Sequence, residues 1–526
     1  MLPALRPIAF SAPHWPCRPN GAPRYLSSRT PFSLLNALRG AFQRLDRPTS
    51  GWNQSSWVDP LVRLDSIGIA DDWPQTAEWL EKRLERLKPN LVLLGAMSVS
   101  LRGTLAAARV IRRSGSANAL VVLGGKHVTE TMWIENGQPR IHRGAPILAD
   151  SAGDLDLFVS GDGEDVIAEL GEGLVEGISN DAGQNLGIMA LQFAQQRLLN
   201  ARGDWAIFWR QEGTLKWLHG RGLGLRPDDY PLVYDAYPIN AHFPVLGRAH
   251  TAHAYSYTSK GCLFRCYFCS ESADINGPVR GLDMAGRRLA SQMLRLAEIA
   301  RACGKVPLSV FVEDSIFLQG APRALRDFSE EMGRLKPDVR FGAQFTIDMI
   351  LDPARQALIC ELAKHGLSYV FIGLETTDEA IVAEMSKNRP SKDGKSRTWL
   401  ARFEEAMSFL IANDINIGVS MLFGLGENQN ARLTMLEQIK VWQDTFREPC
   451  VVSLNWAVKH PMRALSDPTP YDYTRWPVES GDPRLPVIQR LFGEASTNFR
   501  LPATDMPSLE HLHEIETAFS RIRSDI

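Results

Sequence analysis

The chain has 526 residues, 44% of them hydrophobic and 22% charged, with a formal net charge of −2. These values are typical of an ordinary globular protein with two or three domains. The near-zero charge gives no electrostatic reason to expect a nucleic acid or an anionic membrane as partner. The sequence also lacks a run of about 18 apolar residues, so no membrane-spanning helix is expected.

The cysteines indicate a reducing compartment. Three of the seven are clustered, and the other four are scattered along the chain, at Cys17, Cys303, Cys360 and Cys450. An odd number with this distribution argues against a disulfide framework. The first 19 residues contain prolines and no unbroken apolar core, so they make a poor secretory signal. A cytoplasmic protein is therefore expected.

Residues 1–175 are expected to form a doubly wound, Rossmann-like α/β domain. The run Leu91–Leu94 is continuously apolar, as in a strand buried on both faces of a parallel sheet. Strands and helices alternate at the spacing of such a sheet. The predicted strands are 7–11, 61–69, 91–94, 119–123 and 156–159, and the predicted helices are 31–42, 76–87, 101–113 and 165–170.

Three loops at the carboxyl ends of these strands are candidate ligand contacts, because ligands of doubly wound sheets bind there. They are residues 96–101, 124–129 and 161–164. Their glycines let the backbone approach a large flat ligand, and Ser98, Ser100 and Thr129 supply small hydrogen-bonding groups. The alternative is that these glycines are the ones that follow strands in any α/β protein.

Residues 176–250 are expected to form a connector. Regular alternation is lost there, and prolines near 227–231 and at Pro238 mark turns. The segment also holds Trp205, Phe208, Trp209 and Trp217, and aromatic side chains of this size usually become buried. An ordered bridge is therefore predicted in place of a flexible linker.

Residues 251–460 are expected to form a partial (β/α)6 barrel with its chemistry at the carboxyl ends of the strands. A strand over 253–258 leads into the clustered cysteines. Cys450 is expected near the mouth of the barrel, and Gln344 could point inward. The predicted strands after the first are 308–312, 339–347, 368–372, 415–423 and 451–458, and the predicted helices are 289–300, 323–335, 353–365, 397–412 and 429–443.

The clustered cysteines form the motif C-x3-C-x2-C on one short loop, at Cys262, Cys266 and Cys269. Three thiolates can hold three irons of a four-iron cluster and leave the fourth iron open to a small molecule. A structural zinc site is the alternative, but zinc normally takes four ligands, and the sequence has no second cysteine pair of this kind.

This motif is typical of the radical S-adenosylmethionine (SAM) superfamily, which the central part of the chain resembles. The resemblance implies that the three cysteines hold a [4Fe-4S] cluster, that SAM chelates the open iron, and that Phe268 packs on the adenine. It also implies that Glu313 and Asp314 contact the methionine amine and that Glu375 binds a ribose hydroxyl. The run 418–427, with Gly424, would lie beside the adenine. Acidic residues at strand ends also commonly cap the next helix, which is the alternative.

The three N-terminal loops, in the runs VLLGAMSVSLRG, LVVLGGKHVTE and LFVSGDGEDVIAEL, resemble the cobalamin-binding domain that precedes many radical SAM cores. The D-x-H-x-x-G motif, which ligates cobalt in other cobalamin enzymes, is absent, and His127 follows a different strand. That absence fits the family but leaves open a sheet that binds no cobalamin. The implied cobalamin contacts are Ser98, Ser100, Gly124, Gly125, Lys126, Thr129, Gly161, Gly163 and Glu164.

Residues 461–526 lose the alternation and are expected to form a small C-terminal cap with a helix over 508–522. The resemblance covers about residues 90–460. It implies a cobalamin-dependent radical SAM methyltransferase that acts on carbon or phosphorus of a small-molecule or peptide substrate in natural product biosynthesis. A flavodoxin or ferredoxin would donate the electron. The alternatives are a rearrangement, a cyclisation or a polar methylation with the same cofactors, or a scaffold without turnover.

Overall fold

The computed structural model divides the chain into two compact units. Unit 1 comprises Met1–Pro238 and His460–Tyr473, and unit 2 comprises Ile239–Lys459 and Thr474–Ile526. The structure describes residues 7–11, 73–96, 101–114, 118–179, 185–221, 232, 234, 239, 243–247, 250–256, 262–264, 266, 268, 269, 271, 281–384, 398–457, 463, 482–492 and 507–524.

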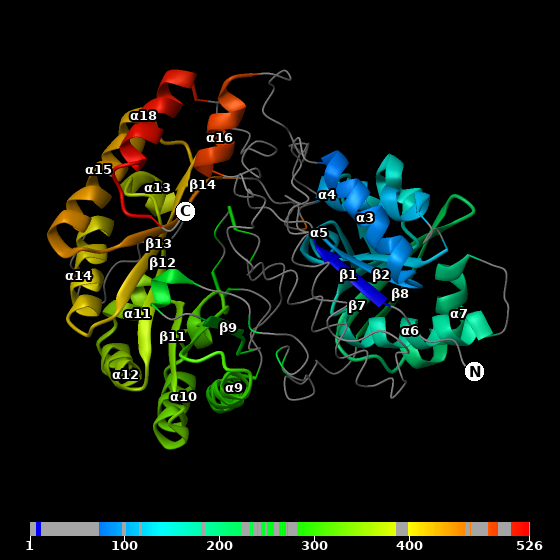
Figure 1. The fold of residues 1–526 in the computed structure, drawn as a ribbon, viewed down its shortest axis with the longest axis horizontal. Helices are drawn as coiled ribbons and strands as arrows, with labels where there is room; N and C mark the ends of the chain where they lie inside the picture. Colours follow the sequence, from blue (N-terminus) through cyan, green and yellow to red (C-terminus); the bar gives the residue numbers. More distant parts are fainter. Residues whose placement is uncertain are drawn as a thin grey trace. The chain divides into compact units, whose positions relative to one another are not determined.

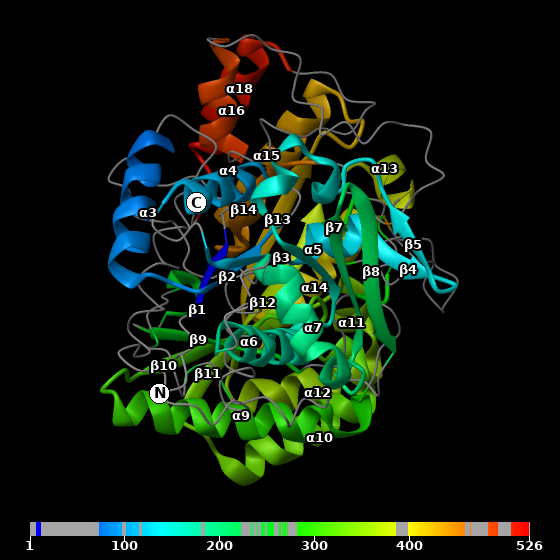
Figure 2. The same cartoon turned by 90° about the vertical axis from the view of Figure 1, so that its right-hand side faces the viewer.

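Unit 1 is built on a six-stranded sheet with the order β1-β2-β3-β6-β7-β8 (Figures 1 and 2). Its first four strands are parallel, which confirms the expected doubly wound arrangement. The predicted helix 31–42 and strand 61–69 lie outside the described residues. The parallel strands are β1 (Pro7–Ser11), β2 (Leu91–Gly95), β3 (Leu120–Gly124) and β6 (Leu157–Gly161).

Two pairs of helices flank this sheet on opposite sides (Figure 1). One pair is α3 (Trp73–Leu87) and α4 (Leu101–Arg113), and the other is α6 (Glu164–Ser179) and α7 (Leu186–Leu198). Helix α6 continues well past the predicted end at Leu170. Within this extension, Gly173 lets α7 approach closely, because a Cβ there would lie 2.3 Å from the carbonyl oxygen of Ala190.

The expected connector adds two antiparallel strands to the same sheet. These are β7 (Asp204–Gln211), which pairs with β6, and β8 (Thr214–Arg221), which pairs with β7. Phe208 of β7 is fully buried, in accord with the expectation that the aromatic residues of this segment pack. Smaller elements of unit 1 are α5 (Lys126–Thr131), β4 (Met132–Glu135), β5 (Gln138–Ile141) and the 3-10 turns η2 (Pro146–Leu148) and η3 (Asp150–Asp154).

Unit 2 is built on six parallel strands in the order β14-β13-β12-β11-β10-β9, which confirms the predicted partial barrel. Strand β9 ends at Ala254, earlier than predicted. Strand β11 also ends early, because the Thr346 side chain accepts a hydrogen bond from Met349 N and starts a short helix. The strands are β9 (His250–Ala254), β10 (Leu308–Val312), β11 (Val339–Gln344), β12 (Leu367–Glu375), β13 (Asn416–Phe423) and β14 (Cys450–Trp456).

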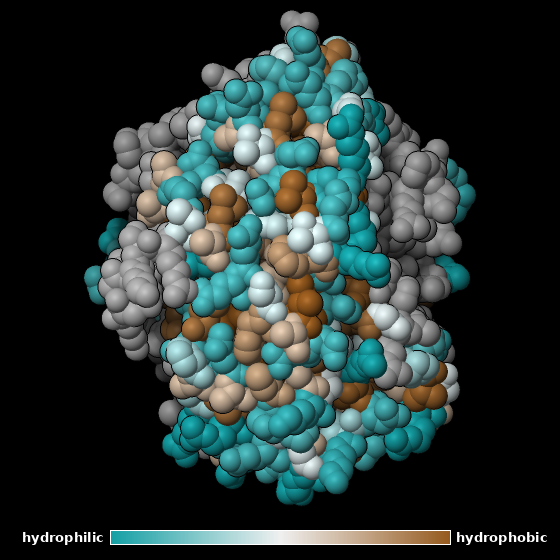
Figure 3. All heavy atoms as spheres, turned by 90° about the vertical axis from the view of Figure 1, so that its left-hand side faces the viewer, coloured by the Kyte–Doolittle hydropathy of each residue, from teal (hydrophilic) through white to brown (hydrophobic). Residues whose placement is uncertain are grey.

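Helices cover the outer side of this curved sheet (Figure 1). Seen from that side, hydrophobic residues appear as separate spots among hydrophilic ones (Figure 3). Within the described residues, no helix is long and apolar enough to cross a membrane. The helices are α9 (Leu282–Ala302), α10 (Pro322–Leu335), α11 (Ile347–Leu351), α12 (Pro353–Lys364), α13 (Glu379–Glu384), α14 (Trp399–Ile411), α15 (Gln429–Phe446), α16 (Arg484–Phe492) and α18 (Leu509–Phe519), with 3-10 turns η6 (Pro244–Leu246) and η7 (Phe317–Gly320).

An aromatic layer crosses the strands inside unit 2. The rings of Phe311 and Tyr369 lie 6.2 Å apart. Two glycines make room for Tyr369, because a Cβ at Gly342 would lie 2.6 Å from its ring, and one at Gly418 would lie 1.8 Å from its hydroxyl. The packing of Tyr369 within the sheet therefore explains why residue 418 is a glycine.

Cys450 does not lie near the mouth, so that expectation is wrong. It begins β14 at the amino end of the strand, opposite the carboxyl ends where the chemistry of such barrels takes place, and it is buried. A strand assigned one residue too late made the cysteine look like part of a loop.

Candidate functional site

The three cysteines lie on the loop that follows β9, at the carboxyl end of the half-barrel. Within this loop, Cys269 N donates a hydrogen bond to Cys266 O over 3.1 Å. The loop is closed by a second bond, in which Cys262 N donates to Glu271 O over 2.7 Å. The described part of the loop is therefore a tight turn closed by its own backbone.

Three thiols on one short loop are the type of donor that an iron–sulfur cluster takes. Burial raises the pKa of the Cys269 thiol to about 12, with further increases from the charges of Glu271, Cys266 and Cys262. Neighbouring thiolates repel one another, and a bound metal ion offsets this repulsion and stabilises the deprotonated form. Within the described residues, no three His, Cys, Asp or Glu side chains converge as they would in a metal centre.

The acidic residues after β10 both have protein partners. Nδ1 of His253 lies 2.6 Å from Oε1 of Glu313, and neither side chain is more than 10% exposed. Asp314 accepts hydrogen bonds from two backbone amides, those of Ser256 at 2.9 Å and Leu318 at 3.2 Å. Both carboxylates thus hold the chain together at the mouth of the barrel, where they were expected to contact a ligand.

Glu375 ends β12 in a strained conformation. Its φ is +62°, in the left-handed region that non-glycine residues rarely adopt, and the pairing with β13 shifts register beside it. Such strain costs on the order of 1–3 kcal/mol and persists where the surrounding structure enforces it, often at functional sites. The Ser420 hydroxyl donates to Oε2 of Glu375 over 3.3 Å.

Phe268 packs in a small apolar cluster at the ends of β13 and β14, whose other members are Ile381, Leu422, Leu425 and Ala457. The cluster brings the residue before the third cysteine to the end of the glycine-containing strand. This is the neighbourhood in which the sequence resemblance places the adenine.

A buried ion pair braces the turn that follows β13. Oε1 and Oε2 of Glu427 accept hydrogen bonds from the backbone amides of Gly424 and Leu425, at 2.7 and 2.8 Å. Arg432 donates to Glu427 over 2.7 Å, and its guanidinium lies 4.7 Å from the Trp456 ring centroid. Glu427 belongs to the predicted motif, whereas Arg432 was not predicted. The one sequence signal for the pair is that Arg432 follows Glu427 by five residues, in the first turn of α15.

In unit 1, the loops after β3 and β6 are tied to each other. The Gly161 amide donates to Oγ1 of Thr129 over 3.1 Å, so two of the predicted ligand loops meet. Ser98 and Ser100 lie outside the described residues. Lys126 begins α5, and Glu164 begins α6 just after Gly163.

Close backbone packing within the fold requires glycine at two positions of these loops. A Cβ at Gly125, whose φ is +97°, would lie 2.8 Å from the backbone of Ala96. A Cβ at Gly161 would lie 2.2 Å from Asp204 O of β7, and Gly124 ends β3. His127 is buried with Nε2 3.0 Å from Gly144 O.

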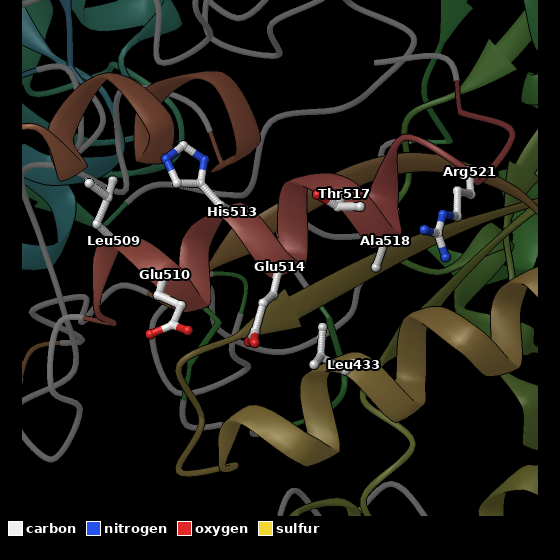
Figure 4. A pocket seen from close by; sticks show the side chains of 8 residues that line it. All are labelled: Leu433, Leu509, Glu510, His513, Glu514, Thr517, Ala518 and Arg521. Carbon is white, nitrogen blue, oxygen red and sulfur yellow. The ribbon is translucent and has the colours of Figure 1, made fainter.

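An open groove lies between α15 and α18 of unit 2 (Figure 4). Its lining includes Leu433 of α15, the α18 side chains Glu510, His513 and Glu514, and Arg521 just beyond α18. None of the candidate cofactor residues lines it.

Comparisons with known proteins agree with this geometry. Residues 256–439 match the model of the radical SAM superfamily. Among solved structures, the radical SAM methyltransferase TsrM from Kitasatospora setae, with cobalamin and a [4Fe-4S] cluster bound, is similar at 14% identity and a TM-score of 0.52, over 98% of this chain and 88% of that one.

Two further structures resemble the chain less closely. TsrM with tryptophan and a SAM analogue bound has 15% identity and a TM-score of 0.49, over 87% of this chain and 75% of that one. The cobalamin-dependent radical SAM enzyme OxsB has 14% identity and a TM-score of 0.47, over 83% of this chain and 52% of its own, so the chain spans about half of it. No match is found among curated proteins.

The match to TsrM shows that the two chains share a fold along nearly their whole length. A radical SAM domain implies a [4Fe-4S] cluster and SAM. Residues 256–439 therefore form a domain of the radical SAM superfamily of enzymes.

Proposed function

We propose that the chain is a cobalamin-dependent radical SAM methyltransferase. The observation that carries the proposal is the combination, in one chain, of a radical SAM domain with a doubly wound sheet domain, in the fold of a methyltransferase that binds cobalamin and a [4Fe-4S] cluster. The methyl acceptor is an unactivated carbon, or phosphorus, of a small-molecule or peptide natural-product precursor. A cytoplasmic flavodoxin or ferredoxin supplies the electron.

The residues of unit 2 would hold the cluster and SAM. When bound, these groups supply the one-electron chemistry that cleaves the sulfonium. The chain's own part is to bind and orient: Glu375 accepts from a ribose hydroxyl, Phe268 with Gly424 forms the adenine wall, and Glu313 or Asp314 receives the methionine amine. Because Glu313 and Asp314 already have protein partners, the amine would share an existing hydrogen-bond network.

The residues of unit 1 would hold cobalamin, whose chemistry is to carry a methyl group. Support comes from the joined loops after β3 and β6, which present backbone amides and small side chains at the carboxyl end of a parallel sheet. The residues are Ser98, Ser100, Gly124, Gly125, Lys126, Thr129, Gly161, Gly163 and Glu164.

The test is anaerobic incubation of the reconstituted chain with SAM carrying an isotopically labelled methyl group, a reductant and candidate acceptors. Methyl transfer predicts labelled product. Deoxyadenosine with an unlabelled, rearranged or cyclised product would instead indicate a rearrangement or cyclisation, and labelled product without deoxyadenosine would indicate a polar methylation. A Cys262→Ala variant is the control, and a wild-type chain as inactive as this variant would indicate a scaffold.

A further inference from the structure

The turn after β10 contacts the cysteine loop on both of its flanks. On the entry side, Oδ1 of Asp314 accepts from the amide of Ser256, two residues after the end of β9. On the exit side, the hydroxyl of Ser315 donates to Oε2 of Glu271 over 3.0 Å. Two consecutive residues of one turn therefore reach the segments before and after the three cysteines.

The exit contact continues directly into the loop. Glu271 uses its side chain for Ser315, and its carbonyl oxygen accepts from the amide of Cys262. A chain of hydrogen bonds thus runs from Ser315 through Glu271 to the first cysteine. Any movement of the Glu271 backbone would be passed to Cys262.

The turn itself is anchored from two sides. Oε1 of Glu313 pairs with the buried ring of His253 on β9, and the Glu313 amide donates to Ala254 O. Oδ2 of Asp314 accepts from the amide of Leu318, which has a left-handed φ of +46°. Hydrogen bonds that include a carboxylate are among the stronger ones in proteins, so this turn is a firm base.

We propose that Glu313–Ser315 form a clamp for the cysteine loop, in which Asp314 fixes the entry to the loop and Ser315 fixes its exit through Glu271. These are positioning residues for the iron–sulfur cluster, and the inference rests on the proposed function of the cysteines. The clamp also places the Glu271 carboxylate beside the loop. A fixed negative charge there opposes the addition of an electron and lowers the reduction potential of the cluster.

The test uses the full chain reconstituted anaerobically with iron and sulfide. Ser315→Ala removes the hydroxyl, Glu271→Gln removes the charge, and Ser315→Thr restores a hydroxyl. Ser291→Ala is a matched control on α9, where the hydroxyl bonds to Arg287 O. The rate at which an iron chelator removes the cluster is measured for each variant, and circular dichroism verifies the fold.

Ser315→Ala and Glu271→Gln should each speed cluster loss by about tenfold, as expected for a hydrogen bond to a charged group. The double variant should be no faster than Ser315→Ala, since Glu271→Gln weakens and Ser315→Ala removes the same contact, and Ser315→Thr and Ser291→Ala should behave as wild type. Glu271→Gln should also raise the midpoint potential, measured by electron paramagnetic resonance, by about 59 mV, equivalent to a tenfold change in a one-electron equilibrium.

Two failures are distinguishable. A wild-type chain that retains no iron overturns the proposed function and the clamp together. A wild-type chain that holds the cluster, with variants that lose it at the wild-type rate or with effects that simply add, overturns the clamp alone. If Ser315→Ala does not fold, the rate of cluster loss and the midpoint potential of Glu271→Gln are compared with those of Ser315→Thr and wild type.

Discussion

Glu375 ends β12 with a left-handed backbone, at a φ of +62°. The hydroxyl of the neighbouring Ser420 donates to Oε2 of its carboxylate. Left-handed backbone at a strand end orients the side chain away from the regular alternation of the strand. Substitution of Glu375 separates the proposed ribose-binding role from the helix-capping alternative.

Substitution Glu375→Gln should weaken SAM binding by about tenfold, because a hydrogen bond to a charged acceptor becomes a bond to a neutral one. The dissociation constant is measured by equilibrium dialysis on the reconstituted chain. Gln keeps the size of the side chain, so the melting temperature should stay unchanged. An unaltered affinity, with the cluster content at the wild-type level, would contradict the ribose-binding role.

At the residue level, the hydrogen-bond partners of the candidate site residues could not be predicted from the sequence. The cysteines and the acidic strand ends follow from spacing and from strand boundaries. The pairing of Glu313 with His253 joins residues 60 positions apart on neighbouring strands. Nothing local marks such a pair, because it depends on strand register. The same is true of Ser315 and Glu271, whose contact depends on the path of a loop.

At the scale of elements, Arg463 shows how a distant segment supports α5. It belongs to unit 1 although it follows all six strands of unit 2. Its Nε donates to Thr129 O over 3.0 Å, its amide donates to Glu130 O, and its guanidinium lies 5.9 Å from the Trp133 ring centroid. Burial lowers the pKa of Arg463, and the charge of Glu130 opposes this decrease. A cation at the carboxyl end of a helix is favourable.

Substitution Arg463→Met should therefore loosen α5 and the hairpin after it. Loss of one hydrogen bond and of the helix-end charge predicts faster amide hydrogen exchange over residues 126–135, by about tenfold. Arg140→Met is the control, because Arg140 pairs with Glu135 on the exposed surface of the same hairpin. Equal exchange in wild type and Arg463→Met would show that the segment 460–473 does not support this helix.

The C-terminal tail meets the edge of the half-barrel. Val451 of β14 pairs with Ser524, and Arg523 donates to Glu448 over 3.1 Å. Burial raises the pKa of Glu448, and the charge of Arg523 opposes that increase. A carboxyl whose pKa is higher in the folded than in the unfolded state contributes stability below its unfolded pKa and loses that contribution as the pH rises through its folded pKa.

Wild type should lose this contribution as the pH rises from 4 to 7, whereas Glu448→Gln has none to lose. The melting temperature of Glu448→Gln relative to wild type should therefore increase over this range, by on the order of 2 °C. Gln keeps an oxygen that can accept from Arg523 but never carries the buried charge. Thermal melts at several pH values test this. If the difference between variant and wild type were constant or shrank toward neutral pH, the raised pKa of Glu448 would be wrong.

Among elements, the parallel strands were the easiest to predict, since a continuous apolar run such as Leu91–Leu94 is typical of a strand buried on both faces. The antiparallel pair β7–β8 was missed, although the apolar run Trp205–Trp209 and the turn glycine Gly213 are local signals of a hairpin. The full length of α6 was also missed. There, Gly173 allows close packing of two helices.

At the scale of the whole molecule, the order of domains could be predicted, and the crossing of the chain between units could not. Arg463 groups with unit 1 although it follows the half-barrel along the chain. Its membership of unit 1 depends on long-range contacts, such as the hydrogen bond to Thr129. The reason for the glycines in the loops of unit 1 also depends on long-range contacts. Side chains at Gly125 and Gly161 would collide with backbone atoms of other elements.

We propose that this one chain binds both an iron–sulfur cluster and cobalamin. The most direct measurement is a metal count with absorbance spectra after anaerobic reconstitution with iron, sulfide and hydroxocobalamin and removal of unbound cofactor. About four irons and one cobalt per chain are expected, with iron lost in a variant whose three cysteines are replaced by alanine. A chain that retains iron without cobalt would contradict the cobalamin half of the claim, and a chain that retains neither would contradict all of it.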